Sequence, residues 1–388
     1  MTNTELRSHA RTKSLMPQGD CLSQMNDALS RFRPRSVFLV VDRAAYELSG
    51  ARIELEGCWR NHEVVEFDDF SSNPRFEDVL TGLDCFRRTP GDVIVAIGGG
   101  TAIDVAKLIR CFAGQQHQPE EIIADNSLIE SSSCPLIATP TTAGTGSETT
   151  HFAVLYRGGE KLSVAHPSIS PDVAILDWRL TRSAPAQIAA ETGLDALSQA
   201  IESIWSIHST EISVSYAVEA MELILGHLES AVRQPTDENR AAMLHAAHLS
   251  GRAIDIAMTT APHAISYTIT HDFGVAHGQA VALTLGPTLV FNAAAVHADL
   301  VDPRGLEHLR SSIDLILSKL DCHDAHEGSE RIATLMETIG CKTRLSQLQI
   351  EGDKVLSRIA DSVNIERLGN NPRRMNGKQL MRLLESIE

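Results

Sequence analysis

A short apolar run that leads straight into a glycine-rich turn is the feature that most constrains this chain. Val93–Ile97 has the length and composition of a buried parallel strand, and it continues into Gly98-Gly-Gly-Thr-Ala-Ile-Asp-Val-Ala-Lys107. Three consecutive glycines let a backbone approach a phosphate closely, Thr101 is placed to cap the helix that follows, and a helix N-terminus attracts negative charge. Taken alone, the segment is about equally well explained as a strand–helix turn without a ligand.

A second loop of the same kind shifts the balance toward ligand binding. Thr139-Pro-Thr-Thr-Ala-Gly-Thr-Gly-Ser-Glu148 follows another predicted strand, Pro135–Thr139, and is crowded with hydroxyl groups and small residues. A flexible surface loop would explain one such segment. Two of them at consecutive strand ends, where doubly wound sheets bind their ligands, predict a site for the ribose and phosphates of a dinucleotide.

The two halves of the chain differ in hydrophobic periodicity. Ser36–Val41 is a third strand-like run, and helical stretches such as Thr101–Cys111 lie between the strands, which predicts a doubly wound α/β fold. Past Pro185 apolar residues recur at helical spacing and strand-like runs are nearly absent. Because 388 residues are enough for two domains, we expect an α/β dinucleotide-binding domain over 1–184 and an all-helical domain over 185–388. The expected helices of the second domain include Gln187–Trp205, Ser213–Val232, Glu238–Met258 and Leu306–Leu320.

Charge and hydropathy argue against several classes of protein. The net charge of −16 disfavours a nucleic-acid partner, because phosphate backbones demand basic patches. No apolar run reaches the ~18 residues that span a bilayer, and residues 1–20 have no apolar signal-peptide core, so we expect no membrane partner. The seven cysteines are scattered without a CxxC pair, which favours reduced thiols in a cytoplasmic protein.

The end of the Ser36–Val41 strand bears on the choice of cofactor. Asp42 can accept hydrogen bonds from an adenosine ribose and would repel a 2′-phosphate, which favours NAD(H). Arg43 points the other way, because a guanidinium there could pair with a 2′-phosphate. An ordinary charged turn would also account for both residues. The pair slightly favours NAD(H) and leaves NADP(H) open.

Candidate metal ligands lie in the second half. Asp195 and Gln199 stand at i and i+4 on one predicted helix face, with Glu202 one turn further, and His263 and His277 follow later in the chain. One carboxylate and two imidazoles suit Zn²⁺ or Fe²⁺ with an open position for substrate. The chain has sixteen histidines, however, and each of these taken singly is explained as well by a hydrogen-bonded structural role.

The motifs together resemble those of the iron-containing (group III) alcohol dehydrogenases. Gly98–Lys107, Thr141–Glu148, Thr192-Gly-Leu-Asp-Ala-Leu197 and His277-Gly278 match in order, and the match runs from Ser36 to Asn370-Asn-Pro-Arg373. The resemblance implies a Rossmann-like N-terminal domain, a helical metal-binding and catalytic domain, and a cleft between them, as in the dehydroquinate synthase-like architecture. It also implies a homodimer or larger assembly.

The same resemblance assigns roles to individual residues. It implies that Asp195, His263 and His277 bind one divalent metal, Fe²⁺ or Zn²⁺. For NAD(P)H it points to Asp42, Asn73, Gly99, Gly100, Thr101, Asp104, Thr141, Thr142, Thr150 and Lys161.

Two positions depart from the family pattern. Gln199 stands where the family usually has a fourth ligand, a histidine; it can offer an amide oxygen, or the site can work with three ligands as in the related glycerol dehydrogenases. Tyr267 replaces a second histidine that lies near the nicotinamide in the family. Tyr267 either donates a proton or fills space, and His271 is a further candidate for the missing imidazole.

The expected reaction is hydride transfer from NAD(P)H to an aldehyde whose oxygen the metal polarises, with Tyr267, water or a ribose hydroxyl relaying the proton. His263–Tyr267, Gln199 and Ala276–Leu283 look similar to reductases of phosphonoacetaldehyde, which make 2-hydroxyethylphosphonate in phosphonate biosynthesis. A dianionic substrate would need nearby cations, for which Arg252, Arg373 and His151 are candidates.

Three alternatives stay open at this point. The substrate can be a small uncharged aldehyde or polyol of the glycerol or lactaldehyde type. The chain can be a dehydroquinate synthase-like lyase, although that branch uses a glutamate ligand and several cations for a substrate phosphate. It can also be a non-catalytic nucleotide-binding relative in which the loss of the fourth ligand ended the metal chemistry.

Overall fold

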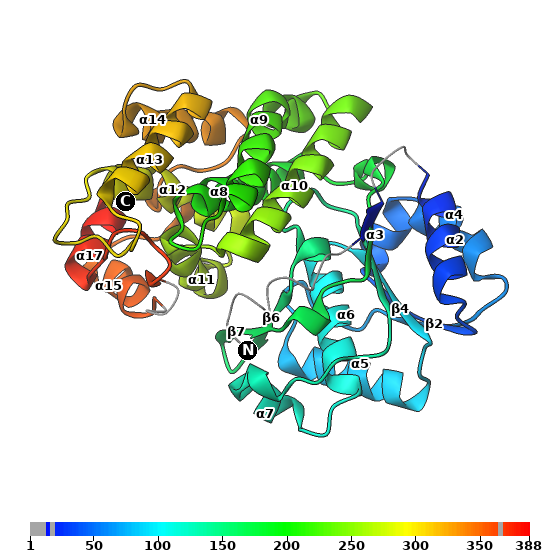
Figure 1. Cartoon of the computed structure of the whole chain (residues 1–388). Coiled ribbons are helices and arrows are strands. Elements are labelled where there is room, and N and C mark those ends of the chain that lie inside the picture. The colour runs from blue at the N-terminus through cyan, green and yellow to red at the C-terminus, as the bar shows by residue number, and fades with distance from the viewer. Residues whose placement is uncertain (1–12, 16–19, 364–367) are drawn as a thin grey trace. The chain divides into compact units, whose positions relative to one another are not determined.

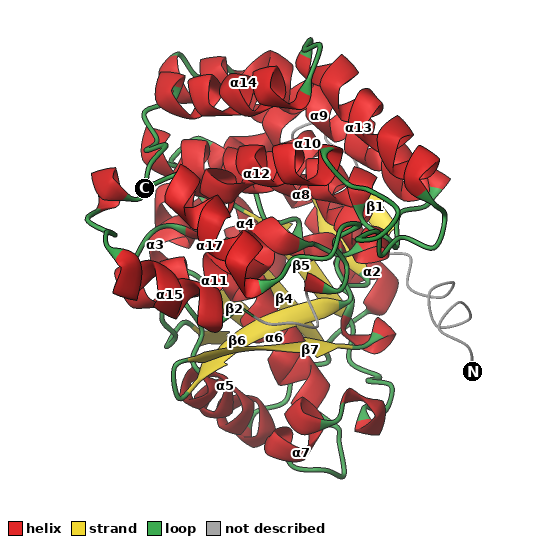
Figure 2. Cartoon of the chain, turned by 90° about the vertical axis from the view of Figure 1, so that its left-hand side faces the viewer, coloured by secondary structure: helices red, strands yellow, loops and turns green. Residues whose placement is uncertain are grey.

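The computed structural model describes residues 13–15, 20–363 and 368–388 of the chain (Figure 1). The chain forms two compact units, the first ending at Ala184 and the second beginning at Pro185. The named strands of the described residues all belong to the first unit, and the second is built from helices (Figure 2).

A six-stranded parallel sheet forms the centre of the N-terminal unit. Its spatial order is β1-β8-β5-β4-β2-β3. The chain places β3 on one side of β2 and then returns to place β4, β5 and β8 on the other side, so the order reverses between β2 and β4. This arrangement confirms the predicted doubly wound fold. The strands are β1 (Lys13–Leu15), β2 (Ser36–Val41), β3 (Glu63–Phe67), β4 (Val93–Gly98), β5 (Leu136–Pro140) and β8 (Val173–Ile175).

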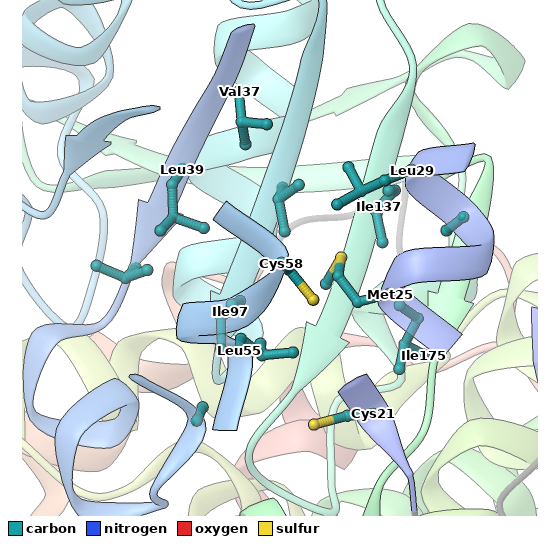
Figure 3. Close-up of a cluster of buried hydrophobic side chains, with 14 of the residues drawn as sticks. Cys21, Met25, Leu29, Val37, Leu39, Leu55, Cys58, Ile97, Ile137 and Ile175 are labelled. Atoms are coloured by element: carbon teal, nitrogen blue, oxygen red, sulfur yellow. The ribbon is translucent and has the colours of Figure 1, made fainter. Parts of the chain in front are cut away.

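Helices cover both faces of this sheet because its strands are apolar on both sides. Val37 and Leu39 of β2 face a core shared with helices α2 (Cys21–Phe32) and α4 (Ala51–Trp59), as Figure 3 shows. The alternate residues Phe38 and Val40 face a second core shared with α5 (Phe76–Arg88) and α6 (Gly100–Ala113). Shorter helices complete the unit: α3 (Arg43–Leu48), α7 (Pro119–Ala124), η1 (Asn126–Leu128), η2 (Ser147–Thr149), η3 (Pro167–Ile169) and η4 (Trp178–Thr181).

An antiparallel hairpin interrupts the parallel pattern, and the periodicity of the sequence did not predict it. Strands β6 (Phe152–Arg157) and β7 (Glu160–Ala165) form a separate two-stranded sheet. The turn between them is Gly158-Gly159, with φ of +58° and +88°. Two consecutive residues with positive φ make the tight turn that matches the twist of a hairpin, and glycine adopts it without strain.

The helical unit is organised around α8 (Ala186–Trp205), which packs against α9 (Glu211–Arg233), α10 (Asp237–Ala257), α12 (His277–Ala293) and α13 (Leu306–Leu320). Every residue from Gly193 to Trp205 is buried, so the polar side chains on this stretch have to find partners inside the protein. None of the helices in the described ranges is long and apolar enough to cross a membrane. Within the described residues the unit also contains α11 (Ala261–Phe273), α14 (Ala325–Thr338), η5 (Ser346–Leu348), α15 (Asp353–Asp361) and α17 (Gly377–Ser386).

The beginning of α12 lies unusually close to α8. A Cβ atom on Gly278 would stand 1.8 Å from the backbone oxygen of Glu191 and 3.0 Å from Cβ of Asp195. Backbone atoms cannot move aside as a flexible side chain can, so only glycine permits this approach. In contrast, a Cβ on Gly226 in the middle of α9 would meet nothing within 4 Å.

We therefore expect opposite effects of two glycine-to-alanine substitutions. Gly278→Ala should lower Tm by about 5 °C or more, since it overpacks the α8–α12 contact. Gly226→Ala should leave Tm unchanged or raise it slightly, because alanine is the better helix former. Calorimetry of both variants beside the parent protein checks this, and an unchanged Tm for Gly278→Ala would contradict the close approach.

Candidate functional site

The nucleotide-binding candidates of the first unit gather at the point where the strand order reverses. Asp42 follows β2 and donates its backbone N–H to the carbonyl of Ile97 at the end of β4, at 3.1 Å. Its carboxylate caps α3 by accepting from the backbone N–H of Ala45 at 3.0 Å. A Cβ on Gly98 would lie 3.0 Å from Cβ of Asp42. The carboxyl ends of neighbouring strands therefore bring Asp42 and the glycine loop side by side, at the usual ligand position of such sheets.

The two predicted loops pack directly on each other. The N–H of Thr141 donates to the carbonyl of Gly98 at 3.0 Å. A Cβ on Gly100 would stand 2.7 Å from the hydroxyl oxygen of Thr145, and one on Gly99 would lie 3.5 Å from that of Thr142. Glycine at position 100 thus lets the second loop lie against the first turn of α6.

Thr101 has a different local role from the expected one. The helix begins at Gly100 with Gly99 in the capping position, so the expectation that Thr101 caps it is wrong. The hydroxyl of Thr101 instead donates to the carbonyl of Ser72 at 2.6 Å. This bond ties Ser72, the residue before Asn73, to the start of α6.

Asp104 and Thr150 are buried, and their polar atoms bind other parts of the protein. Asp104 accepts from the hydroxyl of Ser147 and from the backbone N–H of Val154, and Thr150 accepts from the ammonium of Lys107 at 2.8 Å. Burial raises the pKa of Asp104, while the ammonium of Lys107 acts in the opposite direction. Lys161, in β7, lies opposite Tyr156 of β6.

Three of the metal candidates converge in the helical unit. One ligand atom each of Asp195 (α8), His263 (α11) and His277 (the first residue of α12) can be chosen so that all three lie within 4.8 Å of one another. Oδ1 of Asp195 lies 3.3 Å from Nε2 of His263 and 4.0 Å from Nε2 of His277. A carboxylate oxygen and two imidazole nitrogens facing one point fit a Zn²⁺ or Fe²⁺ ion with room for a further ligand.

Glu202 supports this group through His263; the sequence placed it on the helix face of Asp195 and Gln199 but gave it no role. It is completely buried, and one of its oxygens contacts Nδ1 of His263. Its other oxygen accepts from the backbone N–H and the hydroxyl of Thr260, at 2.8 and 2.9 Å. A carboxylate on Nδ1 fixes the orientation of a histidine whose Nε2 binds a metal. The signal in the sequence was the position of Glu202, seven residues after Asp195 on the same helix face.

The two carboxylates also determine the protonation of His263. Burial alone would lower the pKa of its ring, but the charge of Glu202 and the contacts with Asp195 outweigh burial and raise the pKa to about 9. A metal ion that binds at Nε2 therefore displaces a proton.

Gln199 lies next to Asp195, one helical turn along α8. Its side-chain amide donates a hydrogen bond to Oδ2 of Asp195 at 3.2 Å, the oxygen that does not contact His263. The amide nitrogen therefore faces the carboxylate, and the amide oxygen, the atom that a ligand role would use, is buried.

Of the two relay candidates, Tyr267 reaches the metal group and His271 lies elsewhere. The ring of Tyr267 stacks on that of His277, with centroids 6.2 Å apart and an interplanar angle of 16°. The ring of His271 contacts the carboxylate of Asp272 at 2.8 Å and is not part of the clustered ligand group.

The arginines considered for a substrate phosphonate are engaged by other groups. Arg252 donates to the hydroxyl of Tyr216 and lies over its ring, 4.1 Å from the centroid. Arg373 pairs with Asp299 at 2.8 Å and borders a cavity of about 630 Å³ lined by residues of α12, α14 and α17, which includes none of the metal candidates. His151, in the first unit, packs edge-on against Phe152.

Comparisons with known proteins agree with this geometry. The sequence matches the family model "Iron-containing alcohol dehydrogenase" over residues 13–178 and "Fe-containing alcohol dehydrogenase family, C-terminal" over residues 189–387. It is 35% identical over 307 residues to a phosphonoacetaldehyde reductase of Streptomyces viridochromogenes, covering 77% of this chain and 76% of that protein. It is 34% identical to an NAD-dependent methanol dehydrogenase of Bacillus methanolicus, over 60% of this chain and 62% of that one.

The fold has solved counterparts. The crystal structure of a sulfoacetaldehyde reductase from Bifidobacterium kashiwanohense, in complex with NAD⁺, superposes with a TM-score of 0.87 at 28% identity and covers 97% of each chain. Since family models match both halves and a curated relative aligns over more than three quarters of the chain, this protein belongs to the iron-containing alcohol dehydrogenase family, whose members are oxidoreductases acting on alcohol and aldehyde groups.

Proposed function

We propose that this chain is an NADH-dependent reductase of short aldehydes that works with one divalent metal ion. The observation that carries the proposal is the convergence of Asp195, His263 and His277, with Glu202 behind His263. Two further features support it: the paired phosphate loops of the first unit, and the NAD⁺ bound to the similar sulfoacetaldehyde reductase.

The residues of the helical unit would supply the metal-dependent part of the mechanism. Asp195, His263 and His277 would hold the metal, which when bound acts as a Lewis acid toward the aldehyde oxygen. Glu202 keeps Nε2 of His263 turned toward Asp195, and Gln199 holds the other carboxylate oxygen. Tyr267 packs on His277, and we assign its phenol hydroxyl as the proton donor to the product alkoxide.

The surroundings of Arg43 support NAD(H) over NADP(H). Its guanidinium is bound by Asp68 and lies 3.7 Å from Glu66. Asp42, which follows β2, adds a third carboxylate in the segment next to Arg43. A phosphate would have to displace Asp68 from Arg43 against that charge.

For the substrate, we propose an aldehyde that carries a tetrahedral anionic group, with phosphonoacetaldehyde reduced to 2-hydroxyethylphosphonate as the first choice. The names of the phosphonoacetaldehyde and sulfoacetaldehyde reductases describe the same two-carbon aldehyde with different anionic groups. One observation favours the alternative of a small uncharged aldehyde or polyol: Arg252 and Arg373 both bind other groups.

A substrate panel tests this assignment. With NADH, we expect kcat/KM for phosphonoacetaldehyde to exceed that for propanal, lactaldehyde and glyceraldehyde by about tenfold or more, because the neutral aldehydes lack the anionic group that the proposed site would bind. Sulfoacetaldehyde shows whether the site distinguishes a dianion from a monoanion. A preference for the uncharged aldehydes would contradict the proposed substrate class.

The metal role has its own test. Activity that survives in Asp195→Ala would exclude it.

A second prediction concerns Glu202. In Glu202→Gln the amide oxygen stays with Thr260, so the amide N–H₂ faces Nδ1 of His263 in place of a carboxylate. The Kd for Zn²⁺, measured by competition with a chelator, should rise about tenfold or more. Glu229→Gln, which removes an exposed carboxylate paired with Arg233 on α9, is the matched control and should bind Zn²⁺ normally. Equal Kd values in the two variants would show that Glu202 does not orient the ligand.

A third prediction concerns the selection of the cofactor. Asp68→Asn removes the main partner of Arg43, so the ratio of kcat/KM with NADPH to that with NADH should rise about fivefold. Asp69→Asn removes the adjacent charge without touching this ion pair and should leave the ratio as it was. If the parent protein prefers NADPH, the assignment of NAD(H) is wrong.

A further inference from the structure

Lys107 is a fully buried cation at the core of the nucleotide-binding unit. It lies two turns into α6, and its side chain has no exposed surface. Its ammonium group donates to the hydroxyl of Ser147 at 3.0 Å, to that of Thr150 at 2.8 Å and to the carbonyl of Phe152 at 2.9 Å. The carboxylate of Asp104 lies 3.8 Å away on the preceding turn. A buried ammonium is tolerated only when hydrogen bonds and an opposite charge replace its water shell, as they do here.

All three acceptors belong to one stretch of chain. Ser147 lies near the end of the hydroxyl-rich loop Thr141–Glu148, and Thr150 and Phe152 follow directly after it. The same stretch is held a second time by Asp104, which accepts from the hydroxyl of Ser147 and from the N–H of Val154. Lys107 and Asp104 therefore fix the C-terminal end of the loop to α6.

The loop is also anchored at its start and middle. The N–H of Thr141 is bonded to the carbonyl of Gly98, and Thr145 packs on Gly100. Three attachments thus join the loop to the glycine turn and the helix that carries it. Two attachments involve the turn and the first residue of α6, whereas the third depends on Lys107 and Asp104.

We propose that Lys107 is a positioning residue for the dinucleotide, and that Asp104 and Thr150 act on cofactor binding through Lys107 and Ser147 rather than by contacting the cofactor. This inference rests on the proposed use of NAD(H). Its physical basis is preorganisation: a loop held in its binding conformation loses less entropy when the cofactor binds. The hydroxyl of Thr150 accepts from Lys107 and donates to the carbonyl of Phe152 at 3.3 Å, so these two hydrogen bonds stay within the protein.

A purely structural role for Lys107 is the competing explanation, and the same helix provides a matched control. Arg110 is a buried cation three residues further along α6. It donates to the carbonyl of Ser170 at 2.8 Å and pairs with Asp172 at 2.9 Å, both of which precede β8 and lie outside the loop. Removal of either cation should destabilise the unit, but only Lys107 holds the loop.

The experiment compares Lys107→Met and Arg110→Met in the full-length, metal-loaded protein. We expect both to lower Tm, and only Lys107→Met to raise the Kd for NADH, by about tenfold, which corresponds to about 1.4 kcal/mol. Kd is measured by NADH fluorescence, and Zn²⁺ affinity should be unchanged in both variants. Backbone hydrogen exchange in a peptide covering residues 141–152 should increase in Lys107→Met alone.

A double-mutant cycle with Thr150→Val separates indirect from direct contact. If Thr150 acts through Lys107, the two substitutions together should weaken NADH binding no more than Lys107→Met alone. Additive effects on Kd would show that Thr150 contacts the cofactor itself and would overturn that part of the proposal. Equal Kd values in Lys107→Met and the parent protein would overturn the whole of it.

Two further outcomes of these experiments also test the role of Lys107. If Lys107→Met does not fold, Thr150→Val and Ser147→Ala, which keep the ammonium, should still raise the Kd for NADH and the exchange of residues 141–152; unchanged values would refute the positioning role. If the parent protein binds no NADH, the proposed cofactor fails, and the role of Lys107 fails with it. If the parent protein binds NADH and Lys107→Met binds it equally well, the proposed cofactor stands and only the role of Lys107 fails.

Discussion

The imidazole of His263 lies between two buried carboxylates, and the arrangement of the helical unit follows from that contact. Asp195 and Glu202 are seven residues apart on α8, so they lie on the same side of the helix. Asp195 contacts Nε2 of the ring, and Glu202 contacts Nδ1. Burying two carboxylates is costly unless each is paired and hydrogen-bonded. Thr260 and Gln199 supply hydrogen bonds to the remaining oxygens, and Trp205 in turn donates to Thr260 at 2.8 Å. Because the buried carboxylates need these hydrogen-bond partners, the helices that carry the partners pack in the arrangement that supplies them.

A comparable constraint acts in the nucleotide-binding unit, where backbone contacts matter more than charge. Glycines at positions 98 and 100 allow β2, α6 and the loop from Thr141 to approach more closely than any side chain would permit. The close approach places Asp42, Thr101 and the Thr141 loop around one strand end. The ammonium of Lys107, which is fully buried, binds the end of this loop from inside the protein.

The sequence predicted the doubly wound sheet, the helical second half and the protein family, and these expectations are confirmed. It also named Asp195, His263 and His277, which the fold brings together. It missed the β6–β7 hairpin, although the Gly158-Gly159 turn between two short strand-like runs is a signal that could have found it. It assigned Thr101 to a helix cap and considered Arg252 and Arg373 for the substrate. Their actual partners, Ser72, Tyr216 and Asp299, are 29, 36 and 74 residues away in the chain, beyond the range of any local pattern.

The sequence by itself determined the chemistry that is available: glycine turns after strands, a carboxylate and imidazoles on helices, and a glutamine and a tyrosine where the family has histidines. These follow from local propensity and spacing, which are properties of neighbouring residues. Only the tertiary structure decided how each group is used. Asp68 forms an ion pair with Arg43, and Glu202 orients His263. The side-chain amide of Gln199 donates to Asp195, and the ammonium of Lys107 donates to the hydroxyl of Thr150. Each of these roles depends on which distant partner satisfies a polar group, and the cost of leaving a buried polar group unsatisfied is set by the folded environment.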